Sequence, residues 1–359
     1  GNKRSREVQR KEEWVKKGVE DAQLTILCRT RAQADAAIEV PWLQEIMLDF
    51  LEVQGLNEAV ASVKAAGKRV VVATPRVLKP EEDRMWKFYV KIGADALLVR
   101  SAGMLQQLLD LGGPHAKVEG VGVIPELHGD FSLNIANELS ARQILRDSQL
   151  SRLTPTHDLN AQQLQDLAAN VGTQLSPLLE TIIHQHLPIF HMEHCVFCRF
   201  LSDGNSYKDC GHPCETNTVH LRDERGSDHL VLADMGCRNT VFNAQAQSGA
   251  FYIPALLGAG YRSFRIELVD EPAGQVAALL NGYRDVMHGR QTPGDLWGYL
   301  RHTPDANGKP QGVEAGSLKH TRAEANSRPE DRATLKKTAA QSGKWEQSYL
   351  NQAPIKVER

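Results

Sequence analysis

Five cysteines are concentrated in one short part of the chain, and they are the residues best suited to chemistry. The chain has 359 residues and six cysteines, five of which lie from Cys195 to Cys237. They form a C-x-x-C pair, a C-x-x-x-C pair and one distal cysteine. Thiolates three or four residues apart can bind one soft ion, and further thiolates complete a four-sulfur site. The spacing therefore predicts a structural zinc site or an iron–sulfur cluster.

Polar residues also end several short apolar runs that are typical of strands. In a parallel barrel the carboxyl ends of the strands meet at one mouth, so the polar residues at these ends are expected to face each other. Guanidinium groups bind carboxylates and phosphates with two parallel hydrogen bonds, which predicts an anionic substrate. For each residue alone, a surface ion pair or a helix cap is the alternative. The predicted substrate-binding residues are Arg29, Arg76, Arg100 and Asn134.

Histidines cluster at the seventh of these runs. His184 and His186 are two residues apart, so in a strand they share one face, and one of them could donate a proton at the mouth. A hydrogen-bonded structural histidine is the alternative. We take His184 and Glu267 as the predicted catalytic residues. The chain contains no H-E-x-x-H or G-x-S-x-G motif, which weakens a hydrolytic interpretation.

Eight short apolar runs alternate with amphipathic stretches that are typical of helices. The runs cover residues 24–29, 45–52, 69–74, 96–100, 131–134, 152–154, 179–184 and 263–268. Such alternation indicates βα units around a parallel sheet, so we predict an α/β fold, a TIM-like (β/α)8 barrel. Residues 188–261 form a long Cys-rich insertion between the seventh and eighth strands, far longer than an ordinary loop.

The predicted domain organisation has three parts. A charged connector helix (1–22) precedes the barrel domain (23–302), and residues 303–359 are expected to form a flexible tail because they contain few large apolar groups. The net charge of −2 neither supports nor excludes an RNA partner. No apolar run is long enough to span a bilayer, and the chain opens on Gly1 followed by charged residues. We therefore expect a soluble fragment or processed product.

Several motifs resemble the peptidase U32 family, whose members are also called collagenase-like proteases. The motifs are GDFSLNIAN at 129–137, PIFHMEHC at 188–195, CGHPCE at 210–215, LRD at 221–223, DMGCRNT at 234–240 and FRIE at 264–267. Together they cover roughly residues 24–300. The likeness is closest to the C-terminal part of the long plant and bacterial members.

The resemblance implies an iron–sulfur protein built on a TIM-like barrel. The family's ligands, carried over position by position, fall on Cys195, Cys210, Cys214 and Cys237, which would hold a [4Fe-4S] cluster. Cys198 is left over and could replace Cys195 as a ligand, or be a small buried residue. Zinc remains the alternative ion. A cluster is favoured because installing oxygen at a C–H bond requires electron transfer, which zinc cannot provide.

The resemblance also implies an activity. Characterised members of the family hydroxylate without molecular oxygen: two branches act on a pyrimidine of ribosomal or transfer RNA, and a third acts on the ubiquinone ring as a heterodimer. Prephenate is implicated as the hydroxyl donor, and this dicarboxylate would suit the predicted arginines. We therefore expect an RNA-modifying hydroxylase of the cytoplasm or plastid stroma, not secreted, with RNA as substrate and a partner subunit as a further expectation. The alternatives are a U32-type peptidase and a non-catalytic zinc or cluster protein that binds RNA or a partner.

Overall fold

The computed structural model describes residues 18–51, 53–305, 308–310 and 312–319. The strands are β1 (Gln23–Cys28), β2 (Glu45–Leu48), β3 (Arg69–Ala73), β4 (Ala96–Val99), β5 (Lys117–Val118), β6 (Gly122–Val123), β7 (Glu126–Gly129), β8 (Arg152–Leu153), β9 (Glu180–Met192), β10 (Val219–Arg222), β11 (Asp228–Asp234), β12 (Arg238–Ser248), β13 (Ser263–Glu267) and β14 (Val313–Glu314). The α-helices are α2 (Arg31–Ile38), α3 (Leu56–Ala65), α4 (Asp83–Lys91), α5 (Ala102–Asp110), α6 (Glu138–Asp147), α7 (Ala161–Val171), α8 (Val196–Leu201), α9 (Ile253–Ala259), α10 (Val276–Met287) and α11 (Pro293–His302). Three of the short 3-10 helices matter below: η1 (Phe131–Leu133), η3 (Pro213–Glu215) and η6 (Gly316–Leu318).

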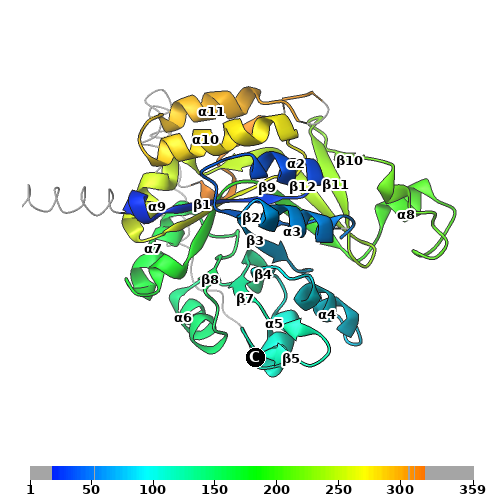
Figure 1. Ribbon diagram of the computed structural model, residues 1–359. Coiled ribbons are helices and arrows are strands. Elements are labelled where there is room, and N and C mark those ends of the chain that lie inside the picture. Colours follow the sequence, from blue (N-terminus) through cyan, green and yellow to red (C-terminus); the bar gives the residue numbers. More distant parts are fainter. Residues whose placement is uncertain (1–17, 52, 306–307, 311, 320–359) are drawn as a thin grey trace, which may run out of the picture.

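One curled sheet organises the molecule (Figure 1). Its strand order is β10-β11-β12-β9-β13-β1-β2-β3-β4-β7-β8, and neighbours from β9 through to β8 run parallel. A parallel bridge joins Leu153 of β8 to Leu179, the residue that precedes β9, so the two ends of the parallel row approach each other. The chain therefore has a mixed α/β fold around a curled, mainly parallel sheet.

Alternation along the parallel strands divides the core into two parts. Successive side chains of a strand point to opposite faces of the sheet. In β2, Ile46 belongs to the large cluster that the helices also supply, whereas Met47 lies in a small separate cluster. The other members of the small cluster are Leu27, Val71, Ala73, Ala96 and Leu98. Glu45 and Asp49 flank Met47 by two residues on either side, so charged residues share the concave face with this cluster.

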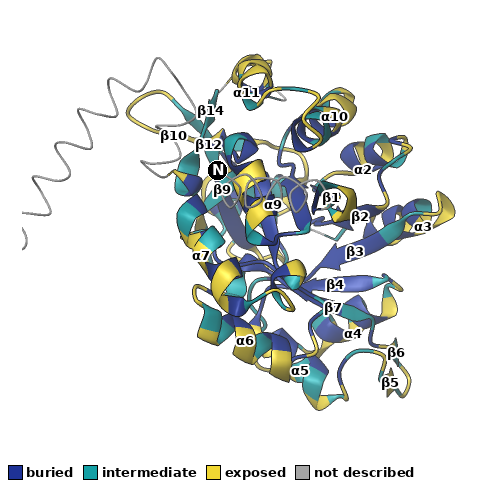
Figure 2. Cartoon of the chain, turned by 90° about the vertical axis from the view of Figure 1, so that its left-hand side faces the viewer, coloured by how far each residue is buried: buried dark blue, intermediate teal, exposed yellow. Residues whose placement is uncertain are grey.

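Helices cover the convex face of the sheet, and polar side chains fix where they begin. Thr30 and Asn160 cap α2 and α7 with capping boxes, and Ser101 and Asn137 cap α5 and α6. Figure 2 shows that the helices turn their buried residues toward the sheet and their exposed residues outward. Because each of these helices begins soon after a strand or turn, the caps also fix the residues at the carboxyl ends of the strands.

Seven of the eight predicted strands overlap observed strands, and the one predicted at 131–134 is wrong. The strand of that unit is β7, five residues earlier, and residues 131–133 form η1. Asp130 caps η1 by accepting the N–H of Phe131 at 2.9 Å. Asn134 ends η1 in a left-handed backbone conformation with φ of 59°. A side-chain cap and a left-handed residue therefore turn this apolar segment away from the strand conformation.

Strand β9 runs far beyond the predicted end at residue 184. Its second half, through Met192, pairs antiparallel with β12, and the register shifts where Phe242 faces Pro188. A proline is tolerated in a strand at such an irregularity. Strands β11 and β10 extend the sheet from β12, and Figure 1 shows α8 projecting beyond this end of the sheet. The segment 188–261, predicted as an insertion, thus begins inside a strand and contains β10, β11, β12, α8 and α9.

The segment after α11 packs against β12. Strand β14 pairs with β12, and Leu318 of η6 is 3% exposed. This part of the predicted flexible tail is therefore packed, because β12 offers a free edge and an apolar site, whereas residues 320–359 lie outside the described residues. Of the predicted connector helix, residues 18–21 are helical and residues 1–17 lie outside the described residues. Within the described ranges, no helix is both long and apolar enough to cross a membrane.

Candidate functional site

All five clustered cysteines line one cavity at the β10–β12 end of the sheet. The cavity measures about 900 Å³. Its walls include the first turn of α8, the loop leading to η3, and the turn that joins β11 to β12. The cysteines in these walls are Cys195, Cys198, Cys210, Cys214 and Cys237. The fold therefore brings the four predicted cofactor ligands and the leftover cysteine together.

Local backbone geometry fixes three of these cysteines. Cys195 is the N-cap of α8, and its Sγ accepts the N–H of Cys198 at 3.4 Å. The Sγ of Cys198 donates to the carbonyl oxygen of Gly204 at 3.4 Å. Cys237 has a left-handed backbone with φ of 60°. This conformation is costly for a residue with a side chain, and such strain is concentrated at ligand-binding sites.

The sulfur of Cys195 has a second hydrogen-bond donor beside it, from a side chain. The Sγ of Cys195 lies 3.9 Å from the donating Nδ2 of Asn239, and hydrogen bonds to sulfur tune iron–sulfur clusters. Across the described ranges, only His186, Asp270 and Glu271 bring three ligand atoms within 4.8 Å of one another. A tetrahedral zinc ion holds its sulfurs roughly 3.8 Å apart. Among the described residues, no three cysteine sulfurs come within 4.8 Å of one another.

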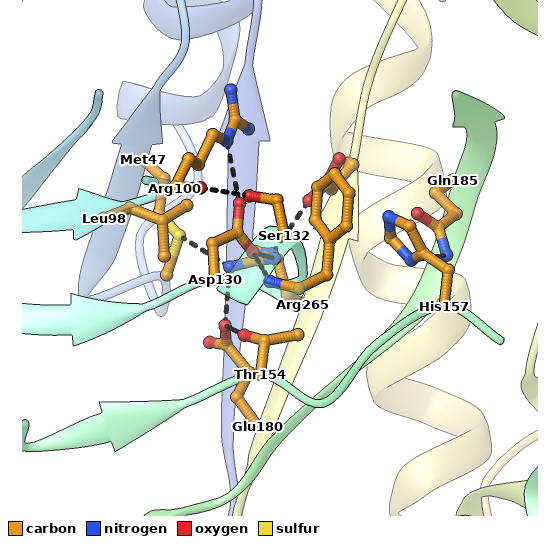
Figure 3. Close-up of polar contacts among 12 residues, drawn as sticks. Met47, Leu98, Arg100, Asp130, Ser132, Thr154, His157, Glu180, Gln185 and Arg265 are labelled. Carbon is orange, nitrogen blue, oxygen red and sulfur yellow. Dashed lines mark hydrogen bonds and ion pairs between the residues drawn. The ribbon is translucent and has the colours of Figure 1, made fainter. Parts of the chain in front are cut away.

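A buried network of ion pairs crosses the concave face of the sheet (Figure 3). Arg265 of β13 donates to Glu180 of β9 at 2.7 Å and to Asp130 at 2.5 Å. The second oxygen of Asp130 accepts from Arg100 Nε at 2.8 Å. Burial alone would raise the pKa of Asp130, but the guanidinium groups of Arg265 and Arg100 hold that pKa well below its usual range. Because Asp130 follows β7, which is not a neighbour of β13, these bonds tie opposite parts of the sheet together.

Arg29 extends this network to the carboxyl ends of the strands. Its Nη2 donates to Glu267 at 3.1 Å, and its Nε lies 3.1 Å from Asp49. Asp49 also accepts from Arg100 Nη1 at 2.8 Å, and Glu267 lies 3.0 Å from Arg265 Nε. The structure thus brings Arg29, Arg100 and Glu267 together. However, carboxylates of the protein already occupy most donors of these two arginines.

Arg76 is the predicted arginine that retains its donors. Its guanidinium lies over the ring of Phe131, 5.2 Å from the centroid, and none of the described carboxylates forms an ion pair with it. With Arg29, Arg100 and Asp234 it lines a small cavity at the strand ends. The Nη2 of Arg100 is buried here without a hydrogen-bond acceptor. Burial, and after it the charge of the neighbouring Arg100, lower the pKa of Arg76, while the charges of Asp130 and Asp234 act in the opposite direction. The cavity measures only about 20 Å³, so its walls would have to move to admit a ligand larger than a water molecule.

Asp234 lines both the cysteine cavity and the arginine-lined cavity. Burial, reinforced by the charge of Asp49, raises the pKa of Asp234 to about 6. His191 Nδ1 lies 3.9 Å from Asp234 and 3.0 Å from Thr240 Oγ1, while its Nε2 is buried without a hydrogen-bond partner. Burial and the nearby Arg76 lower the pKa of His191 to about 4. Asp234 can therefore hold a proton where the two cavities meet, with His191 close to it.

Two predicted site residues lie away from the arginines. His184 is buried, with Nδ1 3.1 Å from the hydroxyl of Tyr283 and Nε2 3.1 Å from Glu271 Oε1. Both ring nitrogens thus have hydrogen-bond partners. His184 is therefore placed as a hydrogen-bonded structural histidine, which was the alternative to a catalytic role. Asn134 is exposed at the end of η1, where its backbone N–H donates to the carbonyl of Phe131 at 3.0 Å. Among the described residues, neither His184 nor Asn134 forms a hydrogen bond or an ion pair with these arginines.

Three residues of the site were missed by the sequence analysis: Asp130, Asp234 and Arg265. Asp130 directly follows β7, and Asp234 ends β11 three residues before Cys237. Arg265 lies inside the apolar run 263–268. A charged residue within or at the end of an apolar run must be paired when it is buried. A charged residue within or beside an apolar run was therefore the sequence feature that could have identified Asp130, Asp234 and Arg265.

One family model matches more than half of the chain. The family model described as Peptidase family U32 matches residues 48–294. A search of curated proteins found no match. Among solved structures, the YdjI aldolase from Escherichia coli K12 is 8% identical with a TM-score of 0.39, covering 83% of this chain and 98% of its own. The spore cortex-lytic enzyme SleL from Bacillus cereus is also 8% identical, with a TM-score of 0.37 and coverage of 76% and 74%. These structural likenesses are too weak to carry an argument.

Proposed function

Because the chain belongs to the peptidase U32 family, we propose that it is an iron–sulfur-dependent, oxygen-independent hydroxylase of a pyrimidine in ribosomal or transfer RNA, with prephenate as hydroxyl donor. One observation carries this proposal: the cavity lined by five cysteines shares Asp234 with a small cavity, of about 20 Å³, that is lined by three arginines and by Asp49. A redox group and an anionic co-substrate would then be neighbours. We further propose that the parallel strands close as a (β/α)8 barrel, which the bridge between Leu153 and Leu179 supports.

The proposed ligands of a [4Fe-4S] cluster are Cys195, Cys210, Cys214 and Cys237, with Cys198 as the substitute for Cys195. When bound, such a cluster supplies one-electron transfer, which a zinc ion cannot supply. The N–H groups of Cys198 and Asn239 would stabilise the thiolate of Cys195. Hydroxylation replaces a C–H bond of the base with a C–O bond, a two-electron oxidation. The hydroxyl donor must therefore leave reduced by two electrons.

The arginines at the strand ends have different proposed roles. Arg76 binds a carboxylate of the anionic donor, because it has no carboxylate partner of its own and Phe131 supports its guanidinium. Arg29 and Arg100 instead position the site, since their donors are held by carboxylates of the network. Glu267 belongs to this positioning set.

Proton handling falls to Asp234 and His191 rather than to His184. Asp234 lies on the boundary of the two cavities, and its raised pKa lets it gain and lose a proton near neutral pH. His191 is neutral at that pH and has a free Nε2. His184 is not assigned a chemical step, because Tyr283 and Glu271 engage both of its nitrogens.

Metal analysis tests the cofactor. The wild-type chain, Cys210→Ser, Cys237→Ser and the control Cys28→Ala are purified anaerobically, and iron, sulfide and zinc are measured. Cys28 is a suitable control because it is fully buried in the hydrophobic core. We expect about four iron atoms per chain in the wild type and the control, and loss of iron in both serine variants. Colourless wild-type protein with stoichiometric zinc would contradict the proposal.

RNA mass analysis tests the reaction. A strain that lacks the gene is complemented with the wild type, with Arg76→Met, or with the exposed control Arg146→Met. We expect the wild type and the control to restore a hydroxylated pyrimidine and Arg76→Met to fail while retaining its iron. The wild type and Cys237→Ser, purified as for the metal analysis, are incubated with denatured collagen. Cleavage that Cys237→Ser abolishes, together with unmodified RNA in every strain, would favour the peptidase alternative.

A further inference from the structure

A second group of metal-type ligands lies outside the cysteine cavity. The imidazole of His186 in β9 and the carboxylates of Asp270 and Glu271 after β13 each place a ligand atom within 4.8 Å of the other two. They line a cavity whose other walls come from α10, α11 and the segment that follows α11. None of the three residues lines the cysteine cavity. The proposed function therefore makes no use of this group.

The hydrogen bond of His186 orients its ring as in a metal-binding histidine. Its Nδ1 lies 2.7 Å from the carbonyl oxygen of Asn243. Since a carbonyl can only accept, the proton is on Nδ1, as is usual when the other ring nitrogen binds a metal. Nε2 lies 3.4 Å from Glu271 Oε1. A tetrahedral ion with bonds of about 2.1 Å holds its ligand atoms about 3.4 Å apart, so this pair already has the required spacing.

Glu271 is fixed in place by the protein. Its Oε2 accepts the N–H of Val269 at 2.6 Å, and its Oε1 lies 3.1 Å from His184 Nε2. His184 in turn contacts the hydroxyl of Tyr283, which bonds to Ser248 at 2.7 Å. Such second contacts orient ligating carboxylates and histidines in metal sites. In such a site, the buried His184 would orient Glu271.

Asp270 and Gln275 carry oxygens in this cavity that accept no hydrogen bond from the described residues. The carboxylate of Asp270 is only partly exposed, and no hydrogen bond or ion pair joins it to another described residue. The Oε1 of Gln275 is buried without a partner and lines the same cavity. Glu271 contacts the imidazoles of His184 and His186, whereas Asp270 forms no ion pair among the described residues, so its negative charge is unbalanced in a half-buried place. A divalent cation would neutralise this charge and satisfy the unpaired oxygens.

We propose that His186, Asp270 and Glu271 bind one divalent transition-metal ion, Zn²⁺ or Mn²⁺. The mixed imidazole and carboxylate donors suit these ions, whereas Mg²⁺ and Ca²⁺ prefer oxygen alone. The ion has a structural role, because Thr303, Pro304, Asp305 and Gly312, which follow α11, line the cavity. Gln275 Nε2 donates to the carbonyl of Pro304 at 3.1 Å, and Asp305 lines the cavity beside it. The ion would therefore tie this segment to the ends of β9 and β13.

Metal titration of intact protein tests the site. The wild type, Asp270→Asn and the exposed control Asp110→Asn are purified anaerobically, dialysed against a chelator, and titrated with Zn²⁺ and with Mn²⁺ by calorimetry. Asp270→Asn removes a ligand without removing a recorded contact, so it should fold. We expect the wild type and the control to bind one equivalent of Zn²⁺ or of Mn²⁺ at this site. The dissociation constant of that equivalent should be at least about tenfold higher in Asp270→Asn. That ion should raise Tm by a few degrees in the wild type and the control alone.

Co²⁺ distinguishes this site from the cysteine cavity. Thiolate ligands give bound Co²⁺ an intense charge-transfer absorption, which nitrogen and oxygen ligands do not give. The equivalent that Asp270→Asn loses should lack this absorption. If Asp270→Asn binds as many equivalents as the wild type with the same affinity, or if the lost equivalent shows the thiolate absorption, the proposal is wrong and His186 and Glu271 form an ion pair only.

Discussion

Removing the charge of Asp130 should destabilise the fold far more than removing the charge of an exposed aspartate. Asp130 is fully buried, and its two oxygens bind Arg100 and Arg265 at 2.8 and 2.5 Å. Asp130→Asn leaves two buried guanidinium groups with one carboxylate fewer between them. Breaking a buried pair by removing one partner costs about 3–5 kcal/mol, much of it from the charge left behind.

The remaining partners set the expected size of this effect. Arg265 keeps Glu180 and Glu267, and Arg100 keeps Asp49, so we expect the lower end of the range, about 3 kcal/mol. Asp35→Asn is the matched control, because Asp35 lies 2.7 Å from Arg31 but is 50% exposed. Exposed pairs contribute less than about 1 kcal/mol. The two substitutions make the same chemical change, but Asp130 is buried, pairs with two arginines and caps η1, whereas Asp35 is exposed and pairs with one arginine.

Urea unfolding followed by circular dichroism measures both variants at pH 7, with unchanged slopes as the condition for comparing them. The pKa of Asp130 is depressed in the folded chain. Its contribution is therefore complete above the unfolded-state pKa of about 4 and declines as the pH falls toward the folded-state pKa. Equal losses of stability in Asp130→Asn and Asp35→Asn would refute the view that this network is dry and stabilising.

Two further predictions concern the cysteine cavity. Because burial raises the pKa of Asp234 to about 6, ionising Asp234 opposes folding. As the pH rises from about 4 to about 6, the free energy of unfolding of the wild type should therefore fall by up to about 3 kcal/mol relative to that of Asp234→Asn. Urea unfolding across this range checks it, and parallel stability curves for the two proteins would contradict it. A Cβ on Gly204 would lie 2.5 Å from the carbonyl oxygen of Asp209, so Gly204→Ala should displace Cys210 and reduce the bound iron measured after anaerobic purification. The control is Gly298→Ala, where a Cβ meets nothing within 4 Å; equal iron in both variants would show that the loop adapts.

The pattern of apolar residues along the sequence predicted most of the parallel strands, but it did not predict β7. Apolar runs such as those of β3 and β4 are unambiguous because both faces of these strands are buried. In β7, Leu127 is the single large apolar residue, whereas the next segment contains Phe131 and Leu133. Hydrophobicity therefore pointed to the wrong segment. The cap at Asp130 decided the conformation, and a cap competes with strand formation through hydrogen bonds that apolar patterns do not report.

The candidate site was predictable where its residues are close in sequence. Spacing alone groups the five cysteines, because a turn or a hairpin brings such residues together. Asp130 and Arg265 are 135 residues apart and meet only through the curvature of the sheet. For the same reason the sequence placed Arg29 and Arg100 near the strand ends but could not reveal that Asp49 and Asp130 occupy their donors.

The position of β13 between β1 and β9 imposes an order on folding. Thr25 of β1 reaches its partner Phe264 across 239 residues, so one edge of β1 stays unpaired until the last parallel strand has been synthesised. At about 5–20 residues per second, this takes roughly 10–50 s on the ribosome. During that time Asp130 and Glu180 also lack Arg265. The same strand that covers an aggregation-prone edge thus supplies the cation for two inner carboxylates, and nascent chains that stop short of β13 are the forms most in need of a chaperone.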